Sequence, residues 1–257
     1  MMTLPRPNRI GWQIASVGVG LLFILLWYAV AQAKLVSPVF LPGPERAWDA
    51  LIYGLTEGDL VVLTLRTVER MFYGWLLASL AGVVLGATIG VSATARAYFE
   101  PTLEFLRPLP ASAMMPVAIA LLGLTDAMVL AVIAFGALWP MLLATVHGFA
   151  AVEPRLYQVS RALGLSRGAV IWKIALPSAM PDILSGMRVG LTIALILAVV
   201  GEMLASRPGL GQAILLAARS FQSADLFAGV MLLGLVGYVS GLLLSLTEAR
   251  LLVWRNA

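Results

Sequence analysis

Side chains that could perform catalysis are scarce in this sequence. It has one histidine, His147, and no cysteine, which excludes a thiolate nucleophile or metal site and leaves no relay of Ser, His and Asp to assemble. A lone histidine without a second ligand at metal-binding spacing favours a packing or interface role. The two lysines, Lys34 and Lys173, follow Ala33 and Trp172, whereas a phosphate-binding P-loop requires Gly-Lys followed by Ser or Thr. We therefore predict that the chain is not an enzyme, holds no metal and does not hydrolyse ATP by itself.

Two charged side chains stand within the apolar stretch at residues 183–204. An ionised group there is costly unless it meets water, a partner charge or a transport pathway. Glu202 is interpreted either as part of a translocation route or its outer gate, or as an interfacial residue paired with a neighbour. Arg188 is expected to extend to the cytoplasmic interface or to pair with Asp182. Met115 completes the set of candidates for the pathway or gate.

The longest polar interruption of the apolar pattern lies at residues 150–182. Apolar residues at roughly helical spacing predict a short amphipathic helix there, but Gly164 and Gly168 each weaken a helix by roughly 1 kcal/mol relative to Ala. The glycines favour a turn between two short helices, and Pro177 and Pro181 are expected to end the connector before the next span. A helix-turn-helix that joins two spans could press on a soluble partner and pass its motion to those spans.

The composition indicates the elements that must position these residues. Hydrophobic residues make up 61% of the chain and charged residues 12%, and the mean hydropathy is +0.95, which is typical of a protein that resides in the lipid bilayer. Long unbroken apolar runs favour helices over the alternating strands of a barrel. The sequence therefore predicts an all-α, polytopic transmembrane helical bundle of about six spans. The net charge of +4 is assigned to Arg-rich cytoplasmic loops and not to nucleic-acid binding.

The apolar runs and polar breaks also predict the organisation along the chain. The small-x-small sequence Ala31-Gln32-Ala33 imitates a signal-peptide cleavage site, but the preceding apolar stretch is long and further spans follow, which favours an uncleaved first span. We predict a cytoplasmic N-terminus at 1–11, a first transmembrane helix at 12–33, an external loop with a short surface helix at 34–62, a core of five further spans at 63–252 that includes the polar loop at 150–182, and a cytoplasmic C-terminus at 253–257.

Small residues recur at every fourth position of the second span, which is expected at about residues 71–91. This spacing places them on one helix face, where another helix can approach closely, either in the chain's own bundle or in a dimer. The residues are Gly74, Ala78, Gly82, Gly86 and Gly90.

Prolines predict that the segment at 98–123 is broken into pieces. We expect a short interfacial helix there before the third span. The prolines are Pro101, Pro108, Pro110 and Pro116.

The distribution of basic residues favours both termini on the cytoplasmic side. With six spans, nine Lys and Arg residues fall inside and four outside, or six outside if Arg66 and Arg70 are added. The inside set is Arg6, Arg9, Arg96, Arg155, Arg161, Arg167, Lys173, Arg250 and Arg255, and the outside set is Lys34, Arg46, Arg207 and Arg219.

Several sequence segments resemble a known family. Gly164, followed after nine residues by Ile174-Ala175-Leu176-Pro177, resembles the tail of the loop signature of inner-membrane permease subunits of binding-protein-dependent ABC importers, although Gln158-Val159-Ser160 stands where the family often has Glu-Ala-Ala. Further segments between about residues 38 and 215 resemble the branch that imports aliphatic sulfonates, taurine, nitrate and similar solutes. They are Leu41-Pro42-Gly43-Pro44 with Ala47-Trp48, Glu69-Arg70 with Gly74, Leu106-Arg107-Pro108-Leu109-Pro110-Ala111 with Met115-Pro116, Gly186-Met187-Arg188, Glu202-Met203 and Gly209-Leu210-Gly211.

The resemblance implies a type I ABC importer permease fold in the cell inner (plasma) membrane. It implies a homodimer of this subunit around the pathway, two ABC ATPase subunits beneath it and an external solute-binding protein that delivers the cargo. ATP and Mg would be bound by the ATPase, with no cofactor in this chain. The resemblance assigns docking into the ATPase to the cytoplasmic loop, through Tyr157, Gln158, Ser160, Arg161, Ala162, Leu163, Gly164, Leu165, Ser166, Gly168, Ile174, Leu176 and Pro177.

The cargo implied by the resemblance is a small anion such as a sulfonate, taurine or nitrate. Two alternatives stay open. One is a permease of the same family for a non-anionic metabolite such as a vitamin precursor. The other is a secondary transporter that works without an ATPase, which predicts intramembrane ion sites and inverted repeats, and neither is visible in the sequence.

Overall fold

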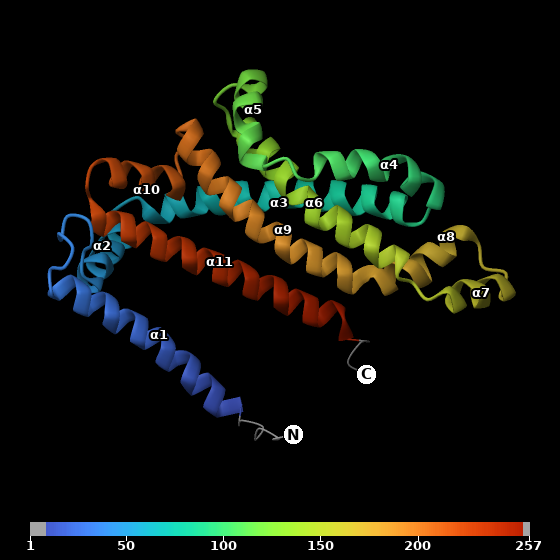
Figure 1. Cartoon of the computed structure of the whole chain (residues 1–257), viewed down its shortest axis with the longest axis horizontal. Coiled ribbons are helices and arrows are strands. Elements are labelled where there is room, and N and C mark those ends of the chain that lie inside the picture. Colours follow the sequence, from blue (N-terminus) through green and yellow to red (C-terminus); the bar gives the residue numbers. More distant parts are fainter. Residues whose placement is uncertain (1–8, 254–257) are drawn as a thin grey trace. The chain divides into compact units, whose positions relative to one another are not determined.

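The computed structural model describes residues 9–253, and every regular element in that range is helical. Helices form because backbone polar groups in lipid must find partners within the chain. Five segments are long and apolar enough to cross a membrane. They are α1 (Arg9–Gln32), α3 (Leu60–Gly90), α6 (Asp126–Ala150), α9 (Leu176–Ala205) with the short helices before it, and α11 (Ser223–Leu251) (Figure 1). The expected all-α fold is confirmed, and residues 1–8 and 254–257 of the expected termini lie outside the described range.

The chain divides into two compact units. The smaller unit comprises the chain up to Val61 together with Ala213–Leu232, and it contains α1, α2 (Pro44–Thr56) and most of α10 (Leu210–Arg219). Within it, Trp27 donates from Nε1 to the carbonyl oxygen of Pro42 at 2.9 Å and stacks on Phe227 with ring centroids 5.3 Å apart. Helix α2 lies within the range expected to form an external loop with a surface helix.

In the larger unit, the stripe of glycines on α3 packs against α6. A methyl group added at any of four glycines would collide with α6, so the two helices approach closely. The collisions pair Gly74 with Ile133, Gly82 with Met141, Gly86 with Thr145 and Gly90 with Phe149. Residue numbers rise together along both helices, which means that α3 and α6 run in the same direction. The small-residue face therefore serves packing inside the chain's own bundle.

The segment between α3 and α6 is the candidate for a sixth span. Because these two neighbouring helices start at the same end, the chain between them must return to that end. It does so through α4 (Ala93–Leu106), a 3-10 turn at Ala111–Met114 and α5 (Met115–Leu122), with a bend of 82° between the two helical parts. The structure has five to six candidate spans, in agreement with the expected count of about six, and it shows the expected break at the prolines.

Helix α9 covers another face of α6. Its glycines also lie against α6, but Gly201 meets Val129 whereas Gly190 meets Met141, so the two helices run in opposite directions. The core between the helices is largely aliphatic, and Met141 and Ile133 are fully buried in it. Helix α6 is therefore held between α3 and α9, and these three helices form the frame that positions the polar residues described below.

The variant Gly86→Ala is expected to weaken the contact between α3 and α6. The added Cβ would lie 2.6 Å from the Cβ of Thr145 and 2.8 Å from the carbonyl oxygen of Leu142, and such overpacking costs roughly 1–3 kcal/mol. Thermal unfolding of the purified protein in detergent should therefore show a lower melting temperature. Gly241→Ala on α11 is the matched control, because nothing lies within 4 Å of its added Cβ. Equal melting temperatures for the two variants would contradict the close approach of α3 and α6.

Candidate functional site

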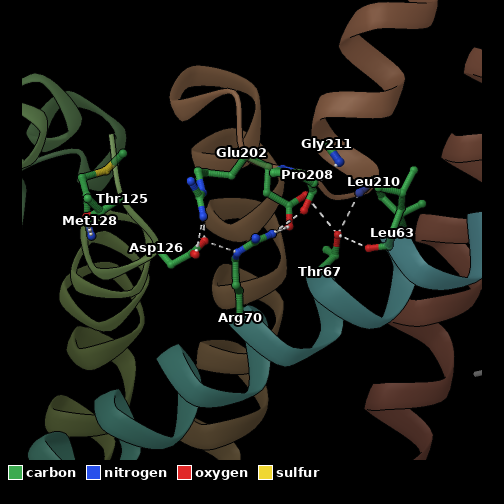
Figure 2. A network of polar contacts seen from close by, with 11 residues as sticks. Leu63, Thr67, Arg70, Thr125, Asp126, Met128, Glu202, Pro208, Leu210 and Gly211 are labelled. Atoms are coloured by element: carbon green, nitrogen blue, oxygen red, sulfur yellow. Dashed lines mark hydrogen bonds and ion pairs between the residues drawn. The ribbon is translucent and has the colours of Figure 1, made fainter. Parts of the chain in front are cut away.

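A buried cluster of charged side chains joins α3, α6 and the end of α9, as Figure 2 shows. Arg70 of α3 donates from Nη1 to Glu202 Oε1 and from Nε to Asp126 Oδ1, both at 2.9 Å. The same Nη1 donates to the carbonyl oxygen of Pro208 at 2.8 Å. The side chain of Arg70 is 10% exposed and that of Glu202 is 0% exposed. Because buried charges are stable only when paired and hydrogen-bonded, this pair ties the two helices together.

The second carboxylate oxygen of Glu202 holds the segment that follows α9. Its Oε2 accepts hydrogen bonds from Thr67 Oγ1 at 3.0 Å and from the backbone N–H of Gly211 at 2.9 Å. The Thr67 hydroxyl in turn accepts a hydrogen bond from the backbone N–H of Leu210 at 2.9 Å. Both oxygens of the buried carboxylate are therefore satisfied, and the first turn of α10 is fixed to α3 and α9.

Two glycines allow this segment to approach Glu202 closely. A methyl group at Gly209 would overlap the Glu202 carboxylate, and one at Gly211 would overlap the carbonyl oxygen of Val199. Ser206 ends α9 in the left-handed conformation, with φ of 50°. Glycine is therefore needed at Gly209 and Gly211, because a side chain at either position would collide with the Glu202 carboxylate or the Val199 carbonyl group.

Asp126, the first residue of α6, bridges Arg70 to a second arginine. Arg207 donates from Nε to Asp126 Oδ1 at 3.1 Å and from Nη2 to Oδ2 at 2.5 Å, a two-bond geometry that suits guanidinium and carboxylate. The hydrogen bond to Asp126, followed by Coulombic attraction to it, raises the pKa of Arg207 above its ordinary value. Two cations and two anions balance in the cluster, and only its Asp126–Arg207 edge reaches the surface, with side chains 47% and 34% exposed.

Of this cluster, the sequence singled out only Glu202 as a candidate site residue. Arg70 was missed because the second span was expected to begin near residue 71, whereas α3 begins at Leu60 and takes Arg70 into the helix. Asp126 was not among the candidates from the sequence. The available signal was the presence of opposite charges at the same end of two apolar helices, since intramembrane charges usually have a partner.

The other two candidates for the pathway or gate lie in different surroundings. Met115 is 0% exposed and belongs to the core of the larger unit. Arg188 makes an ion pair with Glu248 of α11, so the expected pairing with Asp182 is wrong. The cavity beside Arg188 has a volume of about 240 Å³ and is also lined by Thr192. A pathway role for Glu202, Met115 and Arg188 stays a prediction.

At the opposite ends of α6 and α9, the polar loop forms the expected helix-turn-helix. Helix α7 (Pro154–Ala162) is followed by a turn at Gly164, whose φ is +64°. The N–H of Gly164 donates to the carbonyl oxygen of Arg161 at 3.1 Å, and the N–H of Leu165 donates to the carbonyl oxygen of Ser160 at 3.0 Å. This pair of bonds is the Schellman motif, which requires a left-handed residue at the position of Gly164. The side chain of Ser166 then accepts from the N–H of Ala169 and starts α8 (Arg167–Val170).

Helix α8 continues into α9 without a break. A π-helical turn at Ile171–Ala175 joins the two, and the N–H of Leu176 bonds to the carbonyl oxygen of Ile171. Pro177 lies in the first turn of α9 and Pro181 lies inside α9, so the expectation that these prolines end the connector is wrong. Just before these prolines, which have no backbone N–H to donate, the π turn replaces the usual hydrogen bonds four residues apart by bonds five residues apart. The turn at Gly164 is therefore attached directly to a membrane-spanning helix.

The two short helices expose most of the residues that were predicted to dock. The exposed side of this segment is also apolar, since Leu163 is 69% and Trp172 is 71% exposed. Among the predicted docking residues, Gln158, Arg161, Ala162, Leu163, Gly164, Ser166 and Gly168 are exposed, Tyr157, Leu165, Ile174, Leu176 and Pro177 are partly buried, and Ser160 is buried.

A cavity of about 1010 Å³ lies beside α7 and α8. Arg96, Arg161 and Arg167 line it, and the described residues around it include no carboxylate. Such a hollow favours acidic or anionic groups of a partner. Within residues 9–253, no three His, Asp or Glu side chains come close enough together to hold a metal ion. What the arrangement offers chemically is therefore ion pairing and docking.

Comparison with known proteins relates this arrangement to membrane transport. Residues 78–253 match the family model described as "Binding-protein-dependent transport system inner membrane component". The chain is 30% identical to a Bacillus subtilis protein named as the aliphatic sulfonates transport permease SsuC, over 98% of this chain and 91% of that protein. It is 27% identical to the Escherichia coli taurine transport system permease protein TauC, over 94% and 90%. It is 28% identical to the nitrate import permease protein NrtB of Leptolyngbya laminosa, over 80% and 76%.

A solved structure has the same fold. The MetNI methionine ABC transporter in an inward-facing conformation contains a chain that superposes with a TM-score of 0.66 at 17% sequence identity. The superposition covers 76% of this chain and 99% of that one.

Proposed function

The chain belongs to the family of binding-protein-dependent transport system inner membrane components, and we propose that it forms the translocation pathway through which such an importer moves a small anion. As a permease of this family it is a multi-pass protein of the inner membrane, and the ATPase is a separate protein. The observation that carries the proposal is the exposed α7–α8 segment, which continues directly into the membrane-spanning α9. A push on α8 is thereby delivered to a helix of the pathway.

The anionic cargo is supported by what the relatives are named for. Aliphatic sulfonates, taurine and nitrate share a compact group of several oxygen atoms with negative charge. These relatives align with most of this chain, so the same class of cargo is the natural proposal here. The external binding protein would select the individual anion. A vitamin precursor or another neutral metabolite is the second candidate.

Coupling to the ATPase is assigned to α7, α8 and the turn at Gly164. We propose that this end faces the cytoplasm, together with both termini, and that two ATPase subunits beneath a homodimer of the chain receive it. The exposed Leu163 supplies apolar contact, and Arg161 and Arg167 supply charge complementary to an acidic groove. ATP and Mg would bind to the ATPase, and this chain would need no cofactor.

Transport by the reconstituted complex tests the proposal. Proteoliposomes that contain the chain, its ATPase and its binding protein should accumulate at least one labelled anion from the set of ethanesulfonate, taurine, nitrate and bicarbonate, and only with ATP inside the compartment that holds the ATPase. Uptake without ATP would favour a secondary transporter. ATP-dependent uptake of a neutral metabolite, with none of the anions transported, would refute the anionic cargo and leave the importer itself intact.

A further inference from the structure

A cavity of about 360 Å³ lies halfway along the membrane-spanning helices, at the bend between α4 and α5. Arg107 and Ala111 line it from the bend, Trp139 lines it from the middle of the 25-residue α6, and Ile193 lines it from the middle of the 30-residue α9. It is separate from the cluster around Arg70 and from the α7–α8 segment. Its depth is where a solute must pass if these helices surround a pathway.

The cation in this cavity has no partner. Among the described residues, the Arg107 side chain makes no ion pair and no hydrogen bond, either with Glu104 three residues earlier or with any other group. Arg107 is exposed on the surface of the chain, and an unpaired guanidinium at this depth is costly wherever it meets hydrocarbon. Arg107 therefore belongs beside water, an anion or another polar group.

A second unused hydrogen-bond donor belongs to Trp139, which also lines this cavity. The Nε1 atom of Trp139 is buried and has no hydrogen-bond partner, which is unusual for a buried indole N–H. The ring is held by an edge-to-face contact with Phe135, with centroids 5.7 Å apart. Indole and guanidinium groups donate and cannot accept, and the remaining lining side chains are apolar.

We propose that Arg107 and Trp139 form a transient binding site for the oxyanion group of the cargo as it crosses the membrane. The inference rests on the proposed function and deepens it, because it assigns the anion preference to two side chains of this chain. A nitrate or sulfonate group offers only acceptors on a compact frame and matches a site that offers only donors. Two contacts in an otherwise apolar cavity bind weakly enough for release, which conduction requires.

Substitution of the two donors tests the site in the complete transporter. The variants are Arg107→Gln, Arg107→Lys and Trp139→Phe, measured in proteoliposomes with ATPase and binding protein, with whichever of the four labelled anions the wild type transports. We expect the maximal uptake rate to fall about 10-fold or more for Arg107→Gln and roughly 3-fold for Trp139→Phe, since hydrogen bonds to charged groups are the stronger ones. Arg107→Lys keeps the charge and should lie between Arg107→Gln and the wild type. The KM should stay constant, because the binding protein captures the anion first.

Matched controls separate the site from general damage. Arg219→Gln and Trp48→Phe make the same chemical changes at exposed positions on α10 and α2 and should leave uptake unchanged. Unchanged maximal rates in both Arg107→Gln and Trp139→Phe would overturn the inference, while ATP-driven uptake by the wild type would still stand for the proposed function. Equal loss in Arg107→Lys and Arg107→Gln, together with a lowered melting temperature, would also overturn it by indicating a structural role.

Discussion

In the variant Arg70→Met, the melting temperature of the purified permease in detergent is expected to fall by about 10 °C. The substitution leaves the carboxylate of Glu202 fully buried with hydrogen bonds only from Thr67 and Gly211. Removing one partner of a buried ion pair costs about 3–5 kcal/mol, and in a protein of this size each kcal/mol lowers the melting temperature by roughly 2–4 °C. Asp126 loses less, because it is partly exposed and keeps its bonds to Arg207.

A double variant identifies the buried charge as the cause. Glu202→Gln alone should destabilise less than Arg70→Met, because the amide oxygen can still accept from Arg70, which also keeps Asp126 and Pro208, and the main loss is the acceptor of the Gly211 N–H. Adding Glu202→Gln to Arg70→Met removes the stranded charge and should restore part of the lost stability. Arg66→Gln, one turn earlier on α3 and exposed, is the control and should change little. A double variant no more stable than Arg70→Met would contradict this account.

The spans and the turn at Gly164 were predictable because they depend on neighbours in sequence. A run of apolar residues becomes a helix in lipid wherever it lies in the fold. A glycine at the end of a short amphipathic segment indicates a left-handed turn by itself, and residues spaced by four share a face before any partner is known. The glycine stripe of α3 could therefore be predicted as a packing face, although its partner α6 could not.

The polar cluster was not predictable because its members meet only through the packing of three helices. Arg70 and Glu202 are 132 positions apart, and nothing local to either residue indicates the other. For the same reason the sequence offered only nearby Asp182 as a partner for Arg188, beside extension to the interface, whereas Arg188 pairs with Glu248, 60 positions away. The error at Pro177 and Pro181 has another origin. A missing N–H breaks a regular α-helix, but the π turn at Ile171–Ala175 and the packing of α9 against α6 keep the helix continuous.

The variant Gly164→Ala is expected to reduce coupled uptake by the reconstituted transporter about 10-fold or more, with little effect on its melting temperature. Gly164 has φ of +64°, where an L-residue pays roughly 1–2 kcal/mol, and that strain favours opening the Schellman turn. The added methyl group meets nothing within 4 Å, so no clash in the core accompanies the change. The measurement is ATP-dependent uptake together with the amount of ATPase that copurifies with the chain.

The variant Gly168→Ala distinguishes the effect of backbone strain at the turn from the effect of an added methyl group on the surface of this segment. Gly168 also lacks neighbours within 4 Å, but its φ is not positive and it lies within α8, where alanine favours the helix. Coupled uptake should therefore be kept in Gly168→Ala and lost in Gly164→Ala. Equal loss in both would show that contact area on α8, and not the left-handed turn, couples the chain to the ATPase. The geometry of the turn sets the angle at which α7 meets α8 and, through the π turn, α9. Full uptake in both variants would therefore show that this angle plays no part in coupling.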